Sequence, residues 1–188
     1  MIDEKKLLCA FIYSAYDSGY CGLMLEREKR EEHKRLYMSY IRDKKYYPKK
    51  EIEETQEKIM SSVNLNGTRD YIYFGHFDVV KSRIEEQVGS FDEAIKSPII
   101  LNTALNCPTN LYKVIEVNGH EIMGGNIVLF DVRSLRVLDG LEIPKVGDMV
   151  SGHWGYLLEV VDLDLVNRYL KFSRDYFDKI KRSLRKVK

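Results

Sequence analysis

The side chains of this sequence that could bind a metal ion are imidazoles and thiols scattered along the chain. The histidines are His33, His76, His120 and His153, and the cysteines are Cys9, Cys21 and Cys107. Structural zinc sites commonly take two such residues a few positions apart, since one turn then holds both ligands. The runs His76-Phe77-Asp78 and His120-Glu121 would act together only if the fold joined them. The sequence therefore predicts no metal site and no cofactor.

Other catalytic patterns are equally sparse. Triads that combine a serine or cysteine with a histidine are recognised by geometry, so the sequence neither supports nor excludes one. It contains no phosphate-binding glycine loop and no dinucleotide fingerprint. Three cysteines, an odd number without Cys-x-x-Cys spacing, indicate reduced thiols and not a disulfide framework.

Two separate segments carry a more informative pattern. The first is Tyr71-Ile72-Tyr73-Phe74-Gly75-His76-Phe77, and the second runs from Gly125 through Leu138-Asp139-Gly140-Leu141-Glu142. Together they resemble the gamma-glutamylcyclotransferase-like (AIG2-like) family. That family opens with a strand that ends in a Tyr-Gly-Thr or Tyr-Gly-Ser turn, and it later has the motif Leu-Asp-x-x-Glu-Gly. The resemblance covers about residues 68–165.

The resemblance implies a transferase or lyase type of activity. Family members release an amine or peptide from a γ-glutamyl group when the substrate's own α-amine attacks its γ-carbonyl and closes 5-oxoproline. Such an enzyme positions the substrate and moves protons. By resemblance, Glu142 is the general acid/base, and the turn at Gly75 holds a carboxylate through backbone N–H groups. The substrate-binding residues implied are Tyr73, Phe74, Gly75, His76 and Phe77.

Three positions depart from the family pattern. His76 and Phe77 stand where the family has a small hydroxyl residue and leucine, and Ile143 stands where it has glycine. The leading hypothesis is a protein that binds a small amino-acid-like ligand and releases 5-oxoproline. The alternative is a catalytically inactive relative that acts as a protein- or nucleic-acid-binding module.

The elements that must position these residues begin with helices. Residues 5–14 are typical of a buried strand or a short helix, because periodicity cannot decide for so short a run. Residues 23–45 and 50–63 predict amphipathic helices. The aromatic and β-branched run Asp70–Phe74 predicts a strand, and residues 79–96 look helical with an interruption near Gly89.

Strands dominate the second half of the chain. A strand over 111–117 leads into Asn118-Gly119, a strong hairpin signal, and further strands are expected at 126–132, 147–151, 154–162 and 165–172. The last sixteen residues predict a basic amphipathic helix. The expected fold is α+β: a small mixed β-barrel of the cyclotransferase type over residues 65–188, preceded by a mainly helical extension over residues 1–64.

Basic residues concentrate toward the two ends of the chain. Residues 26–50 carry ten Lys/Arg and five Asp/Glu, and residues 171–188 carry eight and two, although the whole chain is at +1. The basic helices expected in these two segments indicate a polyanion or protein partner in addition to the small-molecule ligand. No apolar run approaches the ~20 residues that cross a bilayer, and no secretory signal is recognisable. We therefore expect a cytoplasmic protein with no membrane association.

Overall fold

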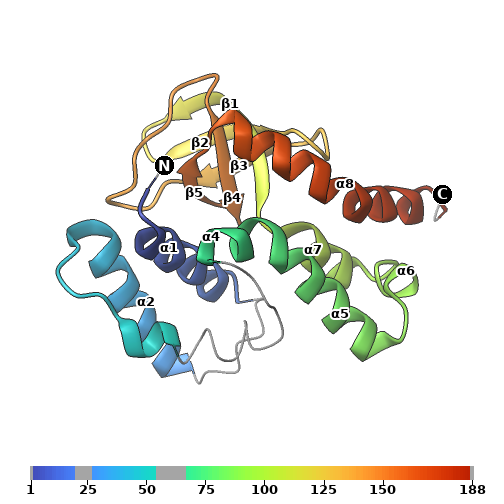
Figure 1. The fold of residues 1–188 in the computed structure, drawn as a ribbon, viewed down its shortest axis with the longest axis horizontal. Coiled ribbons are helices and arrows are strands. Elements are labelled where there is room, and N and C mark those ends of the chain that lie inside the picture. The colour runs from blue at the N-terminus through green and yellow to red at the C-terminus, as the bar shows by residue number, and fades with distance from the viewer. Residues whose placement is uncertain (1, 20–26, 54–66, 187–188) are drawn as a thin grey trace.

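The computed structural model describes residues 2–19, 27–53 and 67–186 and shows an α+β fold with a closed barrel (Figure 1). In the view of Figure 1 the barrel lies above, with helices α1 and α2 below it on one side and helices α4 to α7 on the other. The expected fold class, α+β with a small mixed barrel, is thus confirmed. Its identity as a cyclotransferase-type barrel stays a prediction.

Five strands make the barrel in the order β1-β2-β3-β5-β4. They are β1 (Asn110–Asn118), β2 (Glu121–Asn126), β3 (Val132–Arg136), β4 (Met149–His153) and β5 (Tyr156–Val160). All neighbouring pairs are antiparallel except β3 and β5, which pair in parallel through Arg136 and Tyr156. That single parallel contact makes the barrel mixed.

The hairpin expected at Asn118-Gly119 is present. Asn118 pairs with Glu121, and Gly119 has the positive φ (60°) that this tight turn requires. The strand expected over 126–132 is wrong, because β2 already ends at Asn126. The Asn126 side chain accepts hydrogen bonds from the backbone N–H groups of Val128 (2.9 Å) and Leu129 (2.8 Å). This side-chain bonding replaces the strand ladder with a turn.

The first helix, α1 (Glu4–Ser18), settles the question left open for residues 5–14 in favour of a helix. Asp3 caps its start by accepting a hydrogen bond from the Lys6 N–H at 2.9 Å, and Gly19 with φ 71° ends it. It contacts α2 (Arg27–Asp43) as well as β4 and β5. Neighbouring elements cover α1 on several sides, so most of its residues are apolar. Its sequence therefore lacks the polar face by which a surface helix is recognised.

The strand expected over Asp70–Phe74 is wrong. This run belongs to one helical segment made of α4 (Thr68–Asp70), the π-helix η1 (Tyr71–Gly75) and α5 (His76–Val88). Gly75 has φ −71° and therefore lies inside the helix and not at a turn. Every residue of 71–77 is buried. Its aromatic and β-branched composition thus reflects burial, which short apolar runs report without distinguishing strand from helix.

The remaining helices follow along the chain on the side of the molecule away from α2 (Figure 1). α5 ends at Gly89 (φ 83°), which confirms the expected interruption, and is followed by α6 (Phe91–Ala94) and α7 (Pro98–Asn106). Helix α8 (Leu163–Lys186) begins where a strand over 165–172 was expected, and that prediction is wrong. Asp162 caps α8 by accepting from the Leu165 N–H at 2.8 Å. Its buried positions then recur at helical spacing, namely Leu165, Val166, Tyr169, Ser173, Tyr176, Phe177 and Ile180.

The helix expected over 50–63 falls mostly outside the described residues, of which 49–53 are helical. No helix in the described residues has both the length and the apolar character that crossing a membrane would require. The buried hydrophobic residues form one cluster that includes α1 as well as the barrel strands. The division into domains at residues 64 and 65 stays a prediction.

Candidate functional site

The five residues expected to bind substrate, Tyr73 to Phe77, lie consecutively on a helix, so their side chains point in different directions. Phe74 and Phe77 line a groove against α8. Tyr73 points to Glu159 on β5, and His76 points to Cys107 after α7. Gly75 is buried within the helix. One short segment thus contributes to three different sites.

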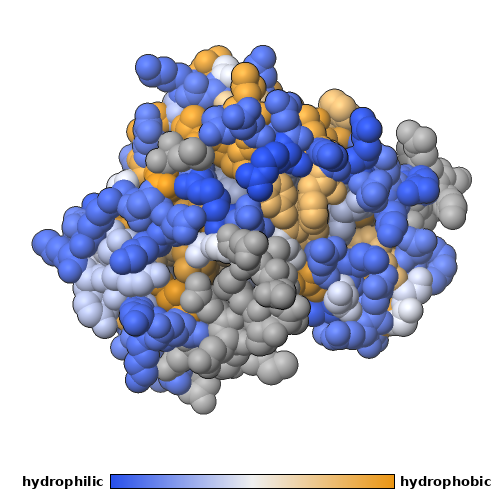
Figure 2. All heavy atoms as spheres, viewed as in Figure 1, coloured by the Kyte–Doolittle hydropathy of each residue, from blue (hydrophilic) through white to orange (hydrophobic). Residues whose placement is uncertain are grey.

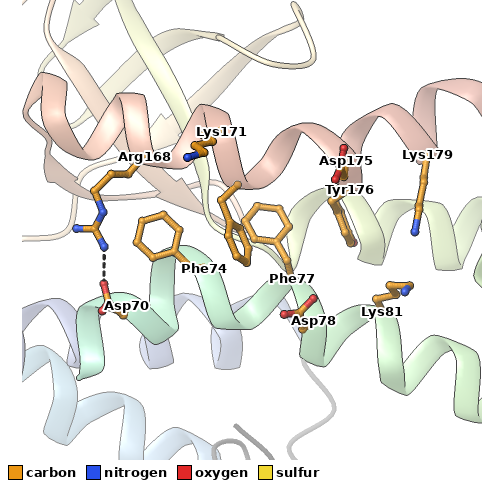
Figure 3. Close-up of a pocket in the computed structure, with 11 residues that line it drawn as sticks. Asp70, Phe74, Phe77, Asp78, Lys81, Arg168, Lys171, Asp175, Tyr176 and Lys179 are labelled. Carbon is orange, nitrogen blue, oxygen red and sulfur yellow. Dashed lines mark hydrogen bonds and ion pairs between the residues drawn. The ribbon is translucent and has the colours of Figure 1, made fainter. Parts of the chain in front are cut away.

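The groove lies between η1/α5 and α8 and has a volume of about 700 Å³ (Figure 3). Aromatic rings form its wall: the Phe74 and Phe172 centroids are 5.4 Å apart, and those of Phe77 and Tyr176 are 4.9 Å apart. Phe172 is 44% exposed although it belongs to this cluster. Figure 2 shows apolar surface beneath α8, bordered by hydrophilic side chains. A ligand with an apolar body therefore finds aromatic surface that is not yet covered.

Charged side chains of both signs border the same groove. In Figure 3 the cations lie toward its two ends and a pair of carboxylates lies between them. The cations are Arg168, Lys171, Lys81 and Lys179, and the pair of carboxylates is Asp78 and Asp175. Arg168 already pairs with Asp70 at 3.0 Å and stacks on Phe74 at 4.8 Å. Within the described part of the chain Lys171, Lys179, Asp78 and Asp175 form no ion pair, so both signs remain available to a ligand.

Tyr73 belongs to a second, buried polar cluster. Its hydroxyl donates to Glu159 Oε1 at 2.8 Å and lies 2.7 Å from Ser151 Oγ. The Glu159 side chain has no exposed surface, and it also pairs with Arg69 and accepts from the Ile2 N–H at 3.1 Å. Burial, together with the negative charge of Glu159, raises the pKa of Tyr73 well above its usual value. Protein groups thus occupy the Glu159 oxygens. The cluster connects η1 and α4 to strand β5 and to the N-terminal segment, and it has a structural role.

His76 belongs to a third cluster, in which four elements meet. Its Nε2 lies 3.2 Å from Cys107 Sγ and its Nδ1 lies 2.9 Å from the Tyr71 hydroxyl. His153, the last residue of β4, completes the group, and one donor atom from each of His76, Cys107 and His153 lies within 4.8 Å of the others. All three residues are buried. His120, the other histidine considered from the sequence, is instead half-exposed and lies 3.6 Å from Asp139.

Burial keeps both imidazoles of this cluster neutral. It lowers the pKa of His76 to about 3, with a smaller contribution from Arg83. Burial also lowers the pKa of His153 well below its usual value, and His76 lowers it further, while backbone groups of Cys107 and Phe11 oppose the shift. A neutral imidazole keeps one nitrogen lone pair, which is the form that binds a metal or accepts a proton.

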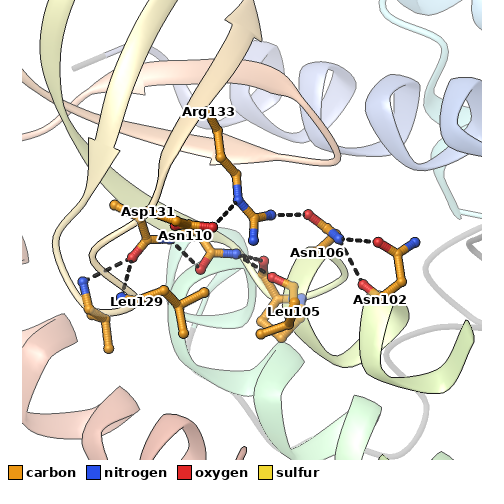
Figure 4. A network of polar contacts seen from close by, with 10 residues as sticks. Asn102, Leu105, Asn106, Asn110, Leu129, Asp131 and Arg133 are labelled. Atoms are coloured by element: carbon orange, nitrogen blue, oxygen red, sulfur yellow. Dashed lines mark hydrogen bonds and ion pairs between the residues drawn. The ribbon is translucent and has the colours of Figure 1, made fainter. Parts of the chain in front are cut away.

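The connection that carries Cys107 is held by a network of amides (Figure 4). Asn110 donates to the carbonyls of Leu105 (2.8 Å) and Pro108 (3.0 Å), on either side of the cysteine. Asn126 in turn donates to Asn110 at 3.1 Å. The position of the thiol is therefore set by β1 and β2 as well as by α7.

Glu142, the expected general acid/base, is exposed in the loop between β3 and β4. Within the described part of the chain no hydrogen bond or ion pair joins it to residues 73–77. The motif around it instead packs on α2: Gly140 has φ 88°, and a Cβ there would lie 2.6 Å from the Arg42 Cα. The glycine of this motif thus has a structural role.

No protein-family model, curated protein or solved structure matches this chain. The resemblance to the gamma-glutamylcyclotransferase-like family therefore stays a prediction, as do the catalytic role of Glu142 and the binding roles of residues 73–77.

Sequence reasoning missed both the contribution of α8 to the groove and the meeting of His76, Cys107 and His153. The helical spacing of aromatic residues after Asp162 was a usable signal for the first. For the second the chain offers no local signal, since the three residues lie on separate elements.

Proposed function

We propose that this protein binds a small zwitterionic, amino-acid-like ligand in the groove between η1/α5 and α8. The observation that carries the proposal is the combination of an aromatic wall with charges of both signs that form no ion pair among the described residues. A volume of about 700 Å³ falls within the range of small-molecule sites. Two of the five residues expected to bind substrate, Phe74 and Phe77, line this groove.

The aromatic wall selects for an apolar or planar ligand body. Phe172 is the ring with the most surface left to cover, and a bound ligand would remove part of that surface from water. Burial of apolar surface contributes about 25 cal/mol per Å², so covering one aromatic face contributes on the order of 1 kcal/mol.

The charges select for the ligand's polar groups. Lys171, close to Phe74, suits a carboxylate, whereas Asp78 and Asp175 suit an ammonium group. An α-amino acid carries both groups, and a γ-glutamyl compound carries a further carboxylate for the lysines at the far end. Charge-assisted hydrogen bonds of this kind orient a ligand more strongly than neutral ones do.

Binding is separable from catalysis in this proposal. The cyclotransferase reaction needs a proton carrier for the attacking and the leaving amine. The predicted one, Glu142, is exposed on a loop, and among the described residues no hydrogen bond or ion pair joins it to the groove lining. The proposed function is therefore ligand binding. Release of 5-oxoproline from the same ligands is a separate activity, to be measured alongside.

The test is isothermal titration calorimetry of the full chain against γ-glutamyl dipeptides and free aromatic amino acids. We expect saturable binding to the wild type and roughly tenfold weaker binding for Phe172→Ala, the loss of about 1.4 kcal/mol typical of an aromatic contact. Lys171→Glu should weaken binding of the same compounds because it repels their carboxylate. The matched control is Phe130→Ala, which removes an 83% exposed phenylalanine outside the groove.

Each outcome bears on the proposal. If no compound of the panel binds, or if Phe172→Ala binds as well as the wild type, the groove is not the site. Mass spectrometry of the same mixtures would reveal 5-oxoproline. Product from the wild type but not from Glu142→Gln would extend the function to cyclotransfer with Glu142 as proton carrier.

The alternative, a polyanion partner, is a separate proposal that the groove supports less well. Asp78 and Asp175 stand among the cations of the groove and would repel a phosphate backbone. Binding of an oligonucleotide that weakens steeply with salt would favour this alternative over the small-ligand proposal.

A further inference from the structure

We propose that His76, Cys107 and His153 form a closed binding site for one thiophilic transition-metal ion, of the closed-shell kind represented by Zn²⁺ and Cu⁺. This inference does not depend on the ligand proposed for the groove. It rests on three observations: the convergence of the donor atoms, the orientation of the two imidazoles, and a buried ring nitrogen for which the described residues provide no hydrogen bond.

The donor atoms already lie near the separations that a metal requires. With metal–nitrogen bonds of about 2.0–2.1 Å and a metal–sulfur bond of about 2.3 Å, tetrahedral or trigonal ligands stand roughly 3.3–3.9 Å apart. His76 Nε2 and Cys107 Sγ are 3.2 Å apart, and no pair of the three donor atoms exceeds 4.8 Å. Closing the site around an ion thus needs a shift of about 1 Å.

The orientation of His153 follows from its hydrogen bonds. Ser14 Oγ donates its proton to the carbonyl of Phe11 at 2.8 Å, so it accepts from His153 Nδ1 at 2.7 Å. In a neutral ring Nδ1 then carries the proton and Nε2 carries a lone pair. That Nε2 is buried, and among the described residues no partner stands in hydrogen-bond geometry to it, although the Cys107 backbone lies close enough to the ring to oppose the fall in its pKa. An unsatisfied buried acceptor is costly, and a metal ion would satisfy it.

The His76 ring is also fixed in position, through both of its nitrogens. Its Nδ1 contacts the Tyr71 hydroxyl, and its Nε2 faces the thiol. Metal-binding histidines characteristically hold their second nitrogen in a hydrogen bond that fixes tautomer and ring orientation. Phe11 also stacks on His153, with ring centroids 4.2 Å apart. His76 is therefore held with Nε2 at the thiol, and the His153 ring is held by Ser14 and Phe11, before any ion binds.

The chemistry of the three donors defines the class of ion. Two imidazoles and a thiolate are soft or borderline ligands that select Zn²⁺ or Cu⁺ over Mg²⁺ or Ca²⁺. On binding, the Cys107 S–H bond breaks, its proton leaves to solvent, and the sulfur lone pair bonds the ion. The bound group then has charge zero with Cu⁺ and +1 with Zn²⁺. Because an uncompensated buried charge is costly, the described donors suit Cu⁺ best.

The experiment starts from protein unfolded with a chelator, because the site is closed and an ion would enter during folding. The chain is refolded with Zn²⁺, or anaerobically with Cu⁺, dialysed, and analysed for metal and protein content. We expect one ion per chain, a higher unfolding midpoint with metal than without, and X-ray absorption spectra that show one sulfur and two nitrogen ligands. A mixed competition of the two ions identifies the preferred one.

Variants separate a metal ligand from a structural residue. Ser14→Ala removes the acceptor that orients His153, and we expect about 10–100-fold weaker metal binding, with Ser14→Thr restoring it. Cys107→Ser should lose more affinity than Ser14→Ala and should no longer be stabilised by metal. His120→Gln and Cys9→Ser, which change the same residue types outside the site, should bind as the wild type does.

Two results would overturn the inference. One is a wild-type chain that refolds, judged by circular dichroism, yet retains neither ion. The other is a folded Cys107→Ser variant that binds metal as tightly as the wild type. Neither result would bear on the groove, whose ligands are measured separately with metal-free protein.

Discussion

Glu159 illustrates how single residues hold this fold together. Its carboxylate has no exposed surface, and its partners come from the N-terminus, from Arg69 before η1 and from Tyr73 within η1. Arg69 also donates to the Ile2 carbonyl at 2.6 Å. A buried ion pair contributes modestly over a well-packed apolar substitute, but removing one partner leaves a buried charge that costs much more.

At this scale we predict that Arg69→Met lowers the free energy of unfolding by about 3–5 kcal/mol, because the Glu159 carboxylate loses its counter-charge. Urea denaturation at pH 7 measures the loss. Adding Glu159→Gln should recover a large part of it, since the neutral amide no longer needs a cation. The control Lys49→Met breaks an ion pair whose side chains are 74% and 55% exposed, and it should cost under about 0.5 kcal/mol. Equal losses for both single variants would contradict the argument.

Among the elements, the loop between β3 and β4 depends on a close approach to α2. Gly140 has φ 88°, and a Cβ at this position would lie 2.6 Å from both the Arg42 Cα and the Ile41 carbonyl oxygen. These are backbone atoms of a helix, which cannot move aside as a flexible side chain would. The Leu138–Glu142 motif therefore joins the barrel to α2.

We predict that Gly140→Ala destabilises the protein by about 2–5 kcal/mol, from a left-handed backbone (about 1–2 kcal/mol) and the clash with α2 (about 1–3 kcal/mol). Gly147→Ala is the matched control, because it has φ 94° and open space around the added methyl group. It should lose only the backbone contribution. Thermal unfolding of both variants measures the difference. A loss for Gly140→Ala no larger than that of its control would show that the loop does not rest on α2.

For the whole molecule, the decisive feature is that α1 shares its core with the barrel. Leu7, Leu8, Phe11 and Ile12 are each at most 3% exposed, and α1 contacts both β4 and β5. Burying one such side chain contributes about 1.5–3 kcal/mol, so four of them approach the 5–15 kcal/mol by which most domains are stable.

We therefore predict that a fragment of residues 65–188 does not fold cooperatively alone, although it contains every barrel strand. Near-ultraviolet circular dichroism and urea titration of the fragment and the full chain test this. The fragment should lack a sharp transition, whereas the full chain shows one. A fragment that unfolds cooperatively at the same urea midpoint would support the division into two domains at residues 64 and 65 and would contradict the shared core.

Local patterns were sufficient for elements whose stability is local. The Asn118-Gly119 turn, the interruption at Gly89, helix α2 and strands β1, β4 and β5 follow from turn chemistry and periodicity that act within a few residues, whereas β2 and β3 were not predicted at their positions. The α+β class with a small mixed barrel followed from the order of these elements. These features are properties of short stretches of chain, and the sequence by itself determined them.

Only the tertiary structure decided those features that depend on burial or on residues far away in the sequence. Tyr71–Phe77 is buried along its whole length, and its aromatic and β-branched composition reflects that burial without distinguishing a helix from a buried strand. Glu142 lies exposed because the loop that carries it rests on α2 through Gly140. Ser14 and His153, 139 residues apart, meet only because α1 packs on β4. No short-range pattern encodes such contacts, since the free energy that forms them comes from the packed core as a whole.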